Sequence, residues 1–411
     1  MRFTDEATVG GRVAFYRRRK GITQEVLAGL LGRSVEWLAQ FERGAKELDR
    51  LSTIVAIADV LGIEPVKLLP AAFTTRRRVL PDSVIGTAPD SMAAIKSAML
   101  RYNGMATLLD VPDRPPAGHA ELAARINEAF IHSQTERWSR LGPLLPDLIA
   151  DAWHASRTST GAAQRRAFGQ LALVWRVTSG MLDRIGEKDL PWIAAERDMA
   201  AADRSADELL IAGAAWRLAV VLRHSGRLQE SIEVPLAAAD ALRPHLAQSP
   251  QHASLYGALM LKGAVGSATL GDHVAVRDYL RECDRAAELT GDRNDFWLAF
   301  GPTNVAIHRV WLAVELGDPT DALRQAAYVD DTTLPSELAE RRTSHLITVA
   351  WAHYLHRHDD DALAALIAAR SAAPEQLMCT HRVHDMLRQM LRRGRRKRRE
   401  LRDLAEFVGM Q

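Results

Sequence analysis

Positively charged side chains that could bind the phosphates of a nucleic acid are concentrated at the two ends of this 411-residue chain. Residues 1–80 contain 14 Lys and Arg against 9 Asp and Glu, although the whole chain has a formal net charge of only +2. Residues 388–402 contain nine further Lys and Arg. Phosphate binding needs such a local excess of cations rather than a high overall charge. The distribution therefore indicates a nucleic acid as a candidate partner.

The carboxyl-terminal basic run has two interpretations. It could contact DNA phosphates. It could also be the solvated outer face of a capping helix, with Leu391, Leu401 and Leu404 turned inward. We favour the second interpretation, because the last unit of a repeat array needs a polar outer face.

Other residue types that support chemistry are sparse. His353, His356 and His358 precede three aspartates, but they fall where a turn is expected, so we predict no metal site. Cys283 and Cys379 have no CxxC neighbour, which argues against a zinc ribbon or a disulfide framework. The chain contains no GxSxG, GxGxxG, P-loop or HExxH motif and no recognisable nucleophile–base pair. We therefore predict that the protein is not an enzyme and uses no cofactor.

Short amphipathic helices must position the amino-terminal cations. The pattern predicts helices over residues 10–20, 23–31, 34–42, 51–61 and 64–69, and glycines end the first four. Thr23 and Ser34 are suited to cap the second and third helices, because their hydroxyls can accept from free amides of the first turn. The apolar stripe of the second helix consists of Val26, Leu27, Leu30 and Leu31.

The second and third helices have the spacing of a helix-turn-helix. When Gln24 is counted as the first position, Ala28 is the fifth, Gly32 the ninth, Leu38 the fifteenth and Phe41 the eighteenth. A small residue is needed where the third helix crosses the second, and a glycine makes the tight turn. The two large apolar side chains anchor the third helix, so that its opposite face is held outward.

The segment TQEVLAGLLGRSVEWLAQFERG, followed by AIADVLGIEPVKLL, resembles the XRE family of phage-repressor-like transcriptional regulators. The resemblance covers about residues 10–70 and rests on several spaced positions that agree together. It implies a five-helix domain, here residues 1–70, that binds double-stranded operator DNA as a homodimer. It also implies DNA contacts for Gln24, Arg33, Ser34, Val35, Glu36, Gln40, Arg43, Lys46 and Arg50.

By this resemblance, the outward face of the third helix meets base edges. Val35 would touch a thymine methyl group, Glu36 would accept from a cytosine amine, and Gln40 would pair with adenine. Arg33 and Ser34 would stand where the helix enters the groove. Members of the family usually bind paired half-sites about one helical turn apart, which implies a dimer.

Further contacts would go to the DNA backbone. Gln24 would donate to a phosphate beside the amino end of its helix, and the three cations that follow the third helix would set register and affinity. The run Arg17–Arg19 is more simply interpreted as a solvated face. The anionic Glu36 and the bulky Trp37 depart from the usual pattern, and we expect Trp37 to pack against the second helix or the linker.

Residues 71–118 are predicted to be a linker, in which two proline-rich loops flank a short helix over about residues 90–102. This helix could serve as a dimerisation or hinge element. From about residue 119 one helix follows another, and turns recur at Gly186, Gly226, Gly271, Gly317 and near Asp359, at intervals of 40, 45, 46 and 42 residues. Alanine-rich helices follow these turns. Such a period is typical of stacked helix pairs.

Residues 119–375 are therefore predicted to form an α-solenoid, with residues 376–411 as basic capping helices, and the fold class is all-α. The array resembles tetratricopeptide-like repeats, although the 34-residue period is not kept. A helix-turn-helix domain fused to such an array resembles peptide-sensing regulators of Gram-positive bacteria and regulator families of actinobacteria. The resemblance implies that a peptide or small molecule in the groove shifts the dimer geometry.

Two alternatives remain open at this point. The array could serve dimerisation alone. The protein could also be an interaction adaptor, whose array recruits a partner while the small domain binds DNA weakly or without specificity.

The chain has no stretch of about 18 apolar residues, so we expect no membrane contact. Its first residues lack the apolar core of a signal peptide, and two cysteines suit a reducing compartment. We predict a cytoplasmic protein.

Overall fold

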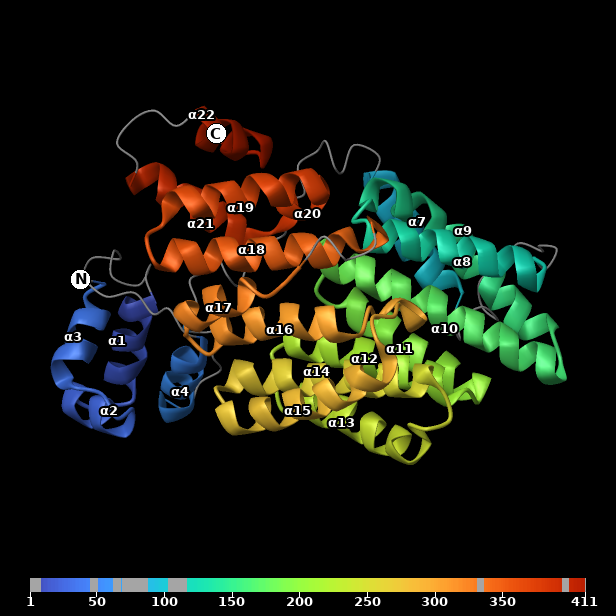
Figure 1. Cartoon of the computed structure of the whole chain (residues 1–411), viewed down its shortest axis with the longest axis horizontal. Helices are drawn as coiled ribbons and strands as arrows, with labels where there is room; N and C mark the ends of the chain where they lie inside the picture. The colour runs from blue at the N-terminus through green and yellow to red at the C-terminus, as the bar shows by residue number, and fades with distance from the viewer. Residues whose placement is uncertain are drawn as a thin grey trace.

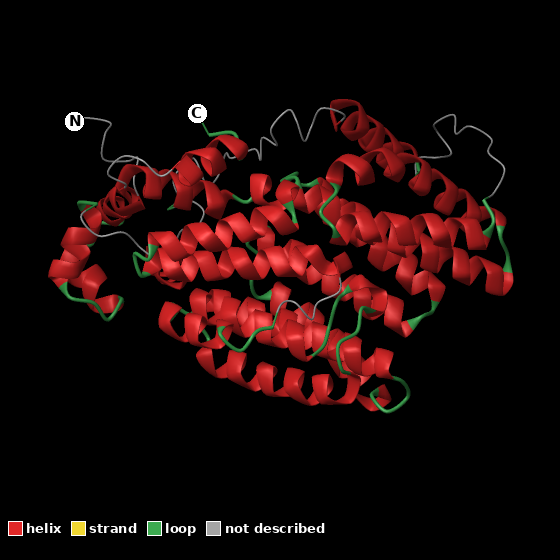
Figure 2. Ribbon diagram, turned by 45° about the horizontal axis from the view of Figure 1, so that its top comes forward, coloured by secondary structure: helices red, strands yellow, loops and turns green. Residues whose placement is uncertain are grey.

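The computed structural model describes residues 9–44, 51–61, 68, 88–102, 117–330, 336–393 and 399–410. Within these residues all regular elements are helices, as predicted, and the only strand-like pairing is an isolated bridge between Arg293 and Phe300 (Figures 1 and 2). The amino-terminal helices are α1 (Val9–Arg19), α2 (Gln24–Leu30), α3 (Val35–Glu42) and α4 (Leu51–Leu61).

The amino-terminal helices enclose one small apolar core. Ala28, Leu38 and Phe41, which the spacing assigns to the helix-turn-helix contact, are all buried. The hydroxyls of Thr23 and Ser34 accept hydrogen bonds from the backbone amides three residues later, at 3.3 and 3.2 Å. Each bond satisfies an amide that has no partner inside its own helix. Both capping predictions are therefore confirmed.

Two glycines allow these helices to cross closely. Gly32 adopts a left-handed φ of 62° in the turn between α2 and α3, a conformation that costs glycine little. Gly10 of α1 lies against the end of α3, where an added Cβ would stand 2.0 Å from the carbonyl oxygen of Phe41.

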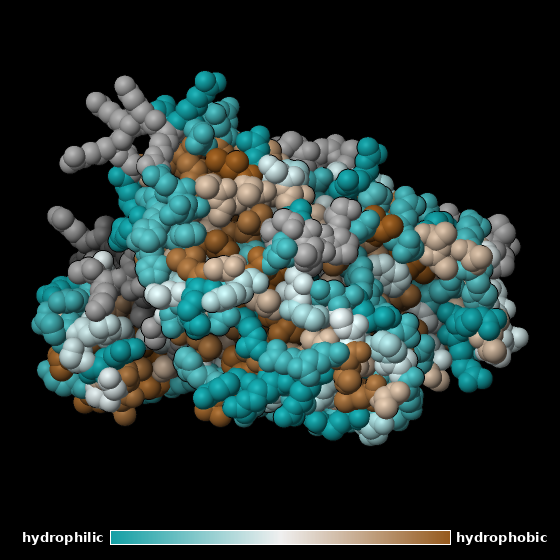
Figure 3. Space-filling view, in the orientation of Figure 1, coloured by the Kyte–Doolittle hydropathy of each residue, from teal (hydrophilic) through white to brown (hydrophobic). Residues whose placement is uncertain are grey.

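The apolar stripe predicted for α2 is wrong at two positions. Leu27 and Ala28 are buried, but Val26 and Leu30 are 47% and 63% exposed, and Figure 3 shows hydrophobic residues at the surface over this helix. Val26 and Leu30 are four residues apart and share one face of the helix. The core of this small domain covers only the neighbouring face.

Five helix pairs make up most of the described array. They are α10 (Gly161–Arg184) with α11 (Leu190–Ser205), α12 (Glu208–His224) with α13 (Glu230–Leu242), α14 (Pro250–Leu270) with α15 (His273–Thr290), α16 (Pro302–Glu315) with α17 (Pro319–Ala326), and α18 (Ala339–Leu355) with α19 (Asp359–Ala372). Successive pairs stack on one another (Figure 1), which is the architecture of a solenoid.

Every pair is closed by the same kind of turn. Gly186, Gly226, Gly271 and Gly317, the glycines that predicted the repeat, have φ values between 78° and 83°. Arg357 takes the left-handed conformation at the fifth turn, with φ 63°. At each turn the amide of the next residue donates to the carbonyl five residues earlier, at 2.8–3.0 Å, which is the bond of a Schellman motif. The repeat prediction is thus confirmed turn by turn.

Further helices cover the two ends of the array. They are α7 (Ala88–Arg101), α8 (His119–Gln134) and α9 (Trp138–Thr158) at one end, and α20 (Pro374–Cys379), α21 (His381–Arg393) and α22 (Arg399–Phe407) at the other. The short helix expected inside the linker is α7. It packs on α9 and buries Ile95 and Met99 in the core shared with α8–α10, so it is the first helix of the array.

The carboxyl-terminal helices match the capping prediction in part. Leu401 and Leu404 are buried, as expected. Leu391 is 37% exposed, so its inward placement was wrong. The buried face of α21 has helical spacing and consists of Val383, Met386, Leu387 and Met390, and Leu391 lies one residue beyond it.

A buried ion pair joins three helices of the array. Arg176 of α10 donates to both oxygens of Asp198 of α11, at 2.9 and 3.2 Å, and to the carbonyl of Leu210 of α12, at 2.8 Å. Both charged side chains are almost inaccessible to solvent. The pair therefore fixes the stacking of the first two helix pairs.

The amino-terminal domain lies beside the array, with α4 packed against α14, the first helix of the middle pair (Figure 1). None of the helices in the described ranges combines the length and apolar character needed to traverse a bilayer.

Candidate DNA-binding surface and central groove

The outward face of α3 is open. We call Arg33, Ser34, Val35, Glu36 and Gln40 the reading face. The first four are exposed and Gln40 is half-buried, while the opposite side of α3 is anchored in the core. Figure 1 places α3 at the outer edge of its domain, on the side away from the array. A straight, exposed helix on a rigid support is what entry into a major groove requires.

Two polar side chains of the reading face are bonded to each other. Gln40 Nε2 donates to Glu36 Oε1 at 3.0 Å, across one helical turn. The Arg33 guanidinium lies 5.4 Å from the ring centre of Trp37. Trp37 is half-buried and stacks on Phe41 of its own helix, with 5.6 Å between the ring centres. Trp37 therefore supports the reading face from the side.

The other residues assigned by the resemblance have varied surroundings. The hydroxyl of Ser34 caps α3. Gln24 Nε2 donates to Glu42 Oε2 at 2.7 Å, so one N–H of the predicted phosphate donor is used inside the domain. Arg43 is exposed at the carboxyl end of α3. Lys46 and Arg50 lie outside the described residues.

Sequence reasoning missed one ion pair in this domain. Arg17, interpreted as part of a solvated charge run, is only 8% exposed. Its guanidinium donates to both carboxylate oxygens of Glu42, at 2.6 and 2.8 Å, and to the carbonyl of Ile22, at 3.0 Å. The hydrogen bonds to Glu42 raise the pKa of Arg17. The pair ties α1 to α3, and its partners are 25 residues apart, beyond the reach of any helical spacing rule.

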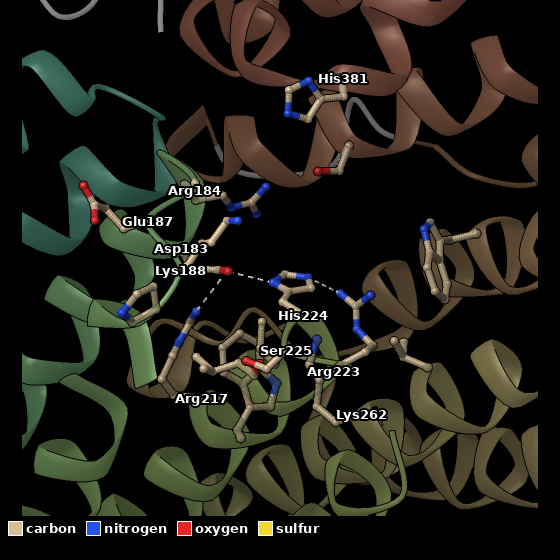
Figure 4. A pocket seen from close by; sticks show the side chains of 18 of the residues that line it. Asp183, Arg184, Glu187, Lys188, Arg217, Arg223, His224, Ser225, Lys262 and His381 are labelled. Carbon is tan, nitrogen blue, oxygen red and sulfur yellow. Dashed lines mark hydrogen bonds and ion pairs between the residues drawn. The ribbon is translucent and has the colours of Figure 1, made fainter. Parts of the chain in front are cut away.

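The array contains a groove of about 850 Å³ between its helix pairs. Side chains of α10, α12, α14, α16, α18 and α21 line it, so the first helix of every pair contributes. Figure 4 shows side chains from α10, α12 and α14 and, from the opposite side, His381 of α21. This volume is in the usual range for a small-molecule pocket, about 300–1,000 Å³.

Several residues that line the groove have a regular spacing in the sequence, which the sequence-based prediction did not use. Arg217, Lys262 and His308 each stand nine residues before the left-handed glycine of their own repeat, and Thr348 stands nine before Arg357. All four line the groove. Equivalent positions of stacked repeats face the same side, so aligning the repeats on their turn residues would have revealed a line of basic side chains.

Part of the charge in the groove is compensated. Glu340 accepts from Arg184, and it pairs with Arg341 at 3.1 Å. Asp183 Oδ1 lies 2.7 Å from Nδ1 of His224 (Figure 4). These pairs link α10 to α12 and to α18.

Among the described residues, three cations of the groove have a distant carboxylate partner or none. The ammonium of Lys262 lies 4.5 Å from the ring centre of Trp216 and makes no ion pair with a described residue. The nearest carboxylate to Arg217 is Asp183, at 3.9 Å, and Arg223 Nη2 lies 2.5 Å from Nε2 of His224.

The pKa values in the groove shift accordingly. Burial, together with Arg341, Arg223 and Arg217, holds the pKa of Lys262 well below its usual value. Burial is also the largest cause that lowers the pKa of Arg217, to about 10. Burial and the nearby cations Lys262 and Arg341 lower the pKa of His308 to about 3. Each shift disfavours the protonated form, as expected where positive charge is concentrated and partly desolvated.

Two groups of side chains could offer ligands to a metal ion, with ligand atoms within 4.8 Å of one another: Glu208, His245 and His252, and His353, His358 and Asp361. In the first group the carboxylate is 2.6 and 3.0 Å from the two imidazoles, distances of ordinary hydrogen bonds. The second group contains two of the histidines weighed from the sequence, and the left-handed turn at Arg357 brings them together.

Comparison with known proteins identifies the amino-terminal domain. Residues 8–70 match a family of helix-turn-helix domains. The chain matches none of the curated proteins and none of the solved structures. The chain therefore carries a helix-turn-helix DNA-binding domain, followed by a helical array that has no matched relative.

Proposed function

We propose that this protein is a sequence-specific transcriptional regulator of the XRE type that binds operator DNA as a homodimer in the cytoplasm. The observation that carries the proposal is the exposed reading face of α3 within a helix-turn-helix domain. Its side chains include an amide, a carboxylate and a guanidinium, the groups that discriminate base pairs in the major groove.

A dimer is proposed because one domain of this kind contacts few base pairs. Two copies with their α3 helices about 34 Å apart would reach successive major grooves on one side of the duplex.

We further propose that the array, as a set of tetratricopeptide-like helix pairs, senses a peptide or small molecule. Support comes from α14, which contributes Lys262 and Val265 to the groove and packs against α4 of the DNA-binding domain. A ligand that favours one position of α14 would change how the two reading faces of a dimer are spaced.

A mobility-shift assay tests the DNA-binding proposal. DNA from the protein's own promoter region, with excess competitor, should give a discrete complex. Gln40→Ala should weaken that complex about tenfold or more, because a bidentate amide–adenine pair contributes about 1–3 kcal/mol of discrimination. Gln229→Ala is a matched control, since Gln229 also donates at 3.0 Å to a glutamate one turn away but lies in the array, just before α13.

The outcomes separate the alternatives. A discrete complex that Gln40→Ala leaves unchanged would refute the base-reading assignment. A wild-type protein that gives only competitor-sensitive smearing would refute the regulator and favour the adaptor.

A further inference from the structure

We infer that the central groove is a binding site for a small organic phosphate, held by a cation cluster of Arg217, Arg223 and Lys262. The inference rests on the proposed sensing function and specifies its ligand class. The fold compensates the charge on α12 and α14 only in part, and these three side chains face one cavity (Figure 4).

The three cations are less well compensated than the neighbouring Arg184. Arg184, which has Glu340 as a partner and Glu136 at 3.8 Å, has a raised pKa, although burial opposes the shift. Burial lowers the pKa of Arg217, Arg223 and Lys262 instead. Arg217 Nε is also buried without a hydrogen-bond partner. A buried donor without an acceptor is costly, and an anion in the groove would supply that acceptor.

The number and type of these cations favour phosphate over a single carboxylate. One carboxylate would offset one of three positive charges, whereas a phosphate monoester or a diphosphate offsets two or more. Guanidinium groups bind phosphate oxygens through two parallel N–H bonds, and the lysine adds a point charge.

The shape of the cavity favours a small molecule with an apolar part. The walls belong to five successive helix pairs and α21, so a nucleic-acid duplex does not fit. The lining also includes the apolar side chains of Val220, Val265, Ile307 and Trp311. An aromatic ring or alkyl group attached to the phosphate would contact these side chains.

Calorimetric titration of the full-length protein, at low salt and without DNA, tests the inference. The probes are pyrophosphate, adenosine diphosphate, and adenosine as a ligand with a ring and no charge. Pyrophosphate and the diphosphate should bind, the diphosphate more tightly, and adenosine should not. Failure of pyrophosphate to bind would overturn the inference, and so would equal binding of adenosine and its diphosphate.

Substitutions locate the site. Lys262→Met keeps the length of the side chain and its packing on Trp216 but removes the charge, and it should weaken pyrophosphate binding about tenfold or more. Lys262→Arg should stay within about threefold of wild type. Arg285→Gln, which removes an exposed arginine of α15, is the control. If Arg43→Gln abolished binding and Lys262→Met did not, the anion would occupy the DNA-binding surface and the inference would be wrong.

The two proposals fail separately. If the protein binds pyrophosphate in the groove but forms no discrete complex with promoter DNA, the phosphate site is supported and the proposed regulator function is refuted. A protein that forms the DNA complex but binds no phosphate probe refutes this site alone.

Discussion

Replacing Glu42 by alanine is expected to loosen the amino-terminal domain and to abolish specific DNA binding. Glu42 accepts two bonds from Arg17, at 2.6 and 2.8 Å, and one from Gln24, at 2.7 Å. Its removal leaves a guanidinium that is 8% exposed without a carboxylate. Breaking a buried ion pair costs about 3–5 kcal/mol. We expect about 3 kcal/mol here, because this pair lies at the edge of a small core.

Hydrogen exchange followed by mass spectrometry measures this loss in the whole protein. A cost of about 3 kcal/mol corresponds to an exchange rate about 150-fold faster in α1–α3, or to complete loss of protection. The amides of the array should keep their rates. Glu25→Ala, which removes an exposed carboxylate of α2, should change exchange less than about threefold.

A rescue variant checks the reasoning. In the double variant Arg17→Met/Glu42→Leu, apolar side chains of similar size replace both charges, so most of the protection should return. An increase in exchange of less than about fivefold in Glu42→Ala would show that the pair behaves like a surface ion pair, and the proposed support of α3 would be refuted.

Two further predictions concern the array. Asp198→Ala leaves Arg176 buried without its partner, which should lower the free energy of unfolding by about 3–5 kcal/mol. Calorimetry should therefore show a melting temperature roughly 10 °C lower. An unchanged melting temperature would contradict this prediction, and Asp203→Ala, which removes an exposed carboxylate, is the control. Because the pKa of His308 is lowered to about 3 in the folded state, only the unfolded chain gains a proton there as pH falls below about 6.5. The free energy of unfolding should therefore fall by up to about 2 kcal/mol by pH 5. In urea titrations of His308→Gln, this contribution to the decrease should be absent.

The local chemistry of the sequence was enough to predict several features. Thr23 and Ser34 cap their helices, and Gly32 makes the turn of the helix-turn-helix, because each depends on contacts within a few residues. The repeat glycines are equally local, since a left-handed residue after a helix is favourable for glycine wherever it occurs. The order of the helix pairs followed from these turns.

The burial of apolar side chains at the edge of a helix face was harder to predict from the sequence. Val26, Leu30 and Leu391 are apolar and fit a helical stripe, yet each is exposed. An apolar pattern specifies a face of a helix, but the neighbouring helices determine how much of that face is covered. The short helix α7 was placed in a linker for the same reason, because nothing near it in the sequence encodes the surface of α9.

The sequence by itself determined the all-helical class, the frame of the helix-turn-helix and the positions of the repeat turns, because all three depend on contacts between residues close in the chain. Only the tertiary structure decided that Arg17 meets Glu42, that Arg176 meets Asp198, and that Lys262 faces the groove without an ion-pair partner among the described residues. Those outcomes join residues from different helices. The energy of a charge depends on which groups, and how much water, the completed packing leaves around it.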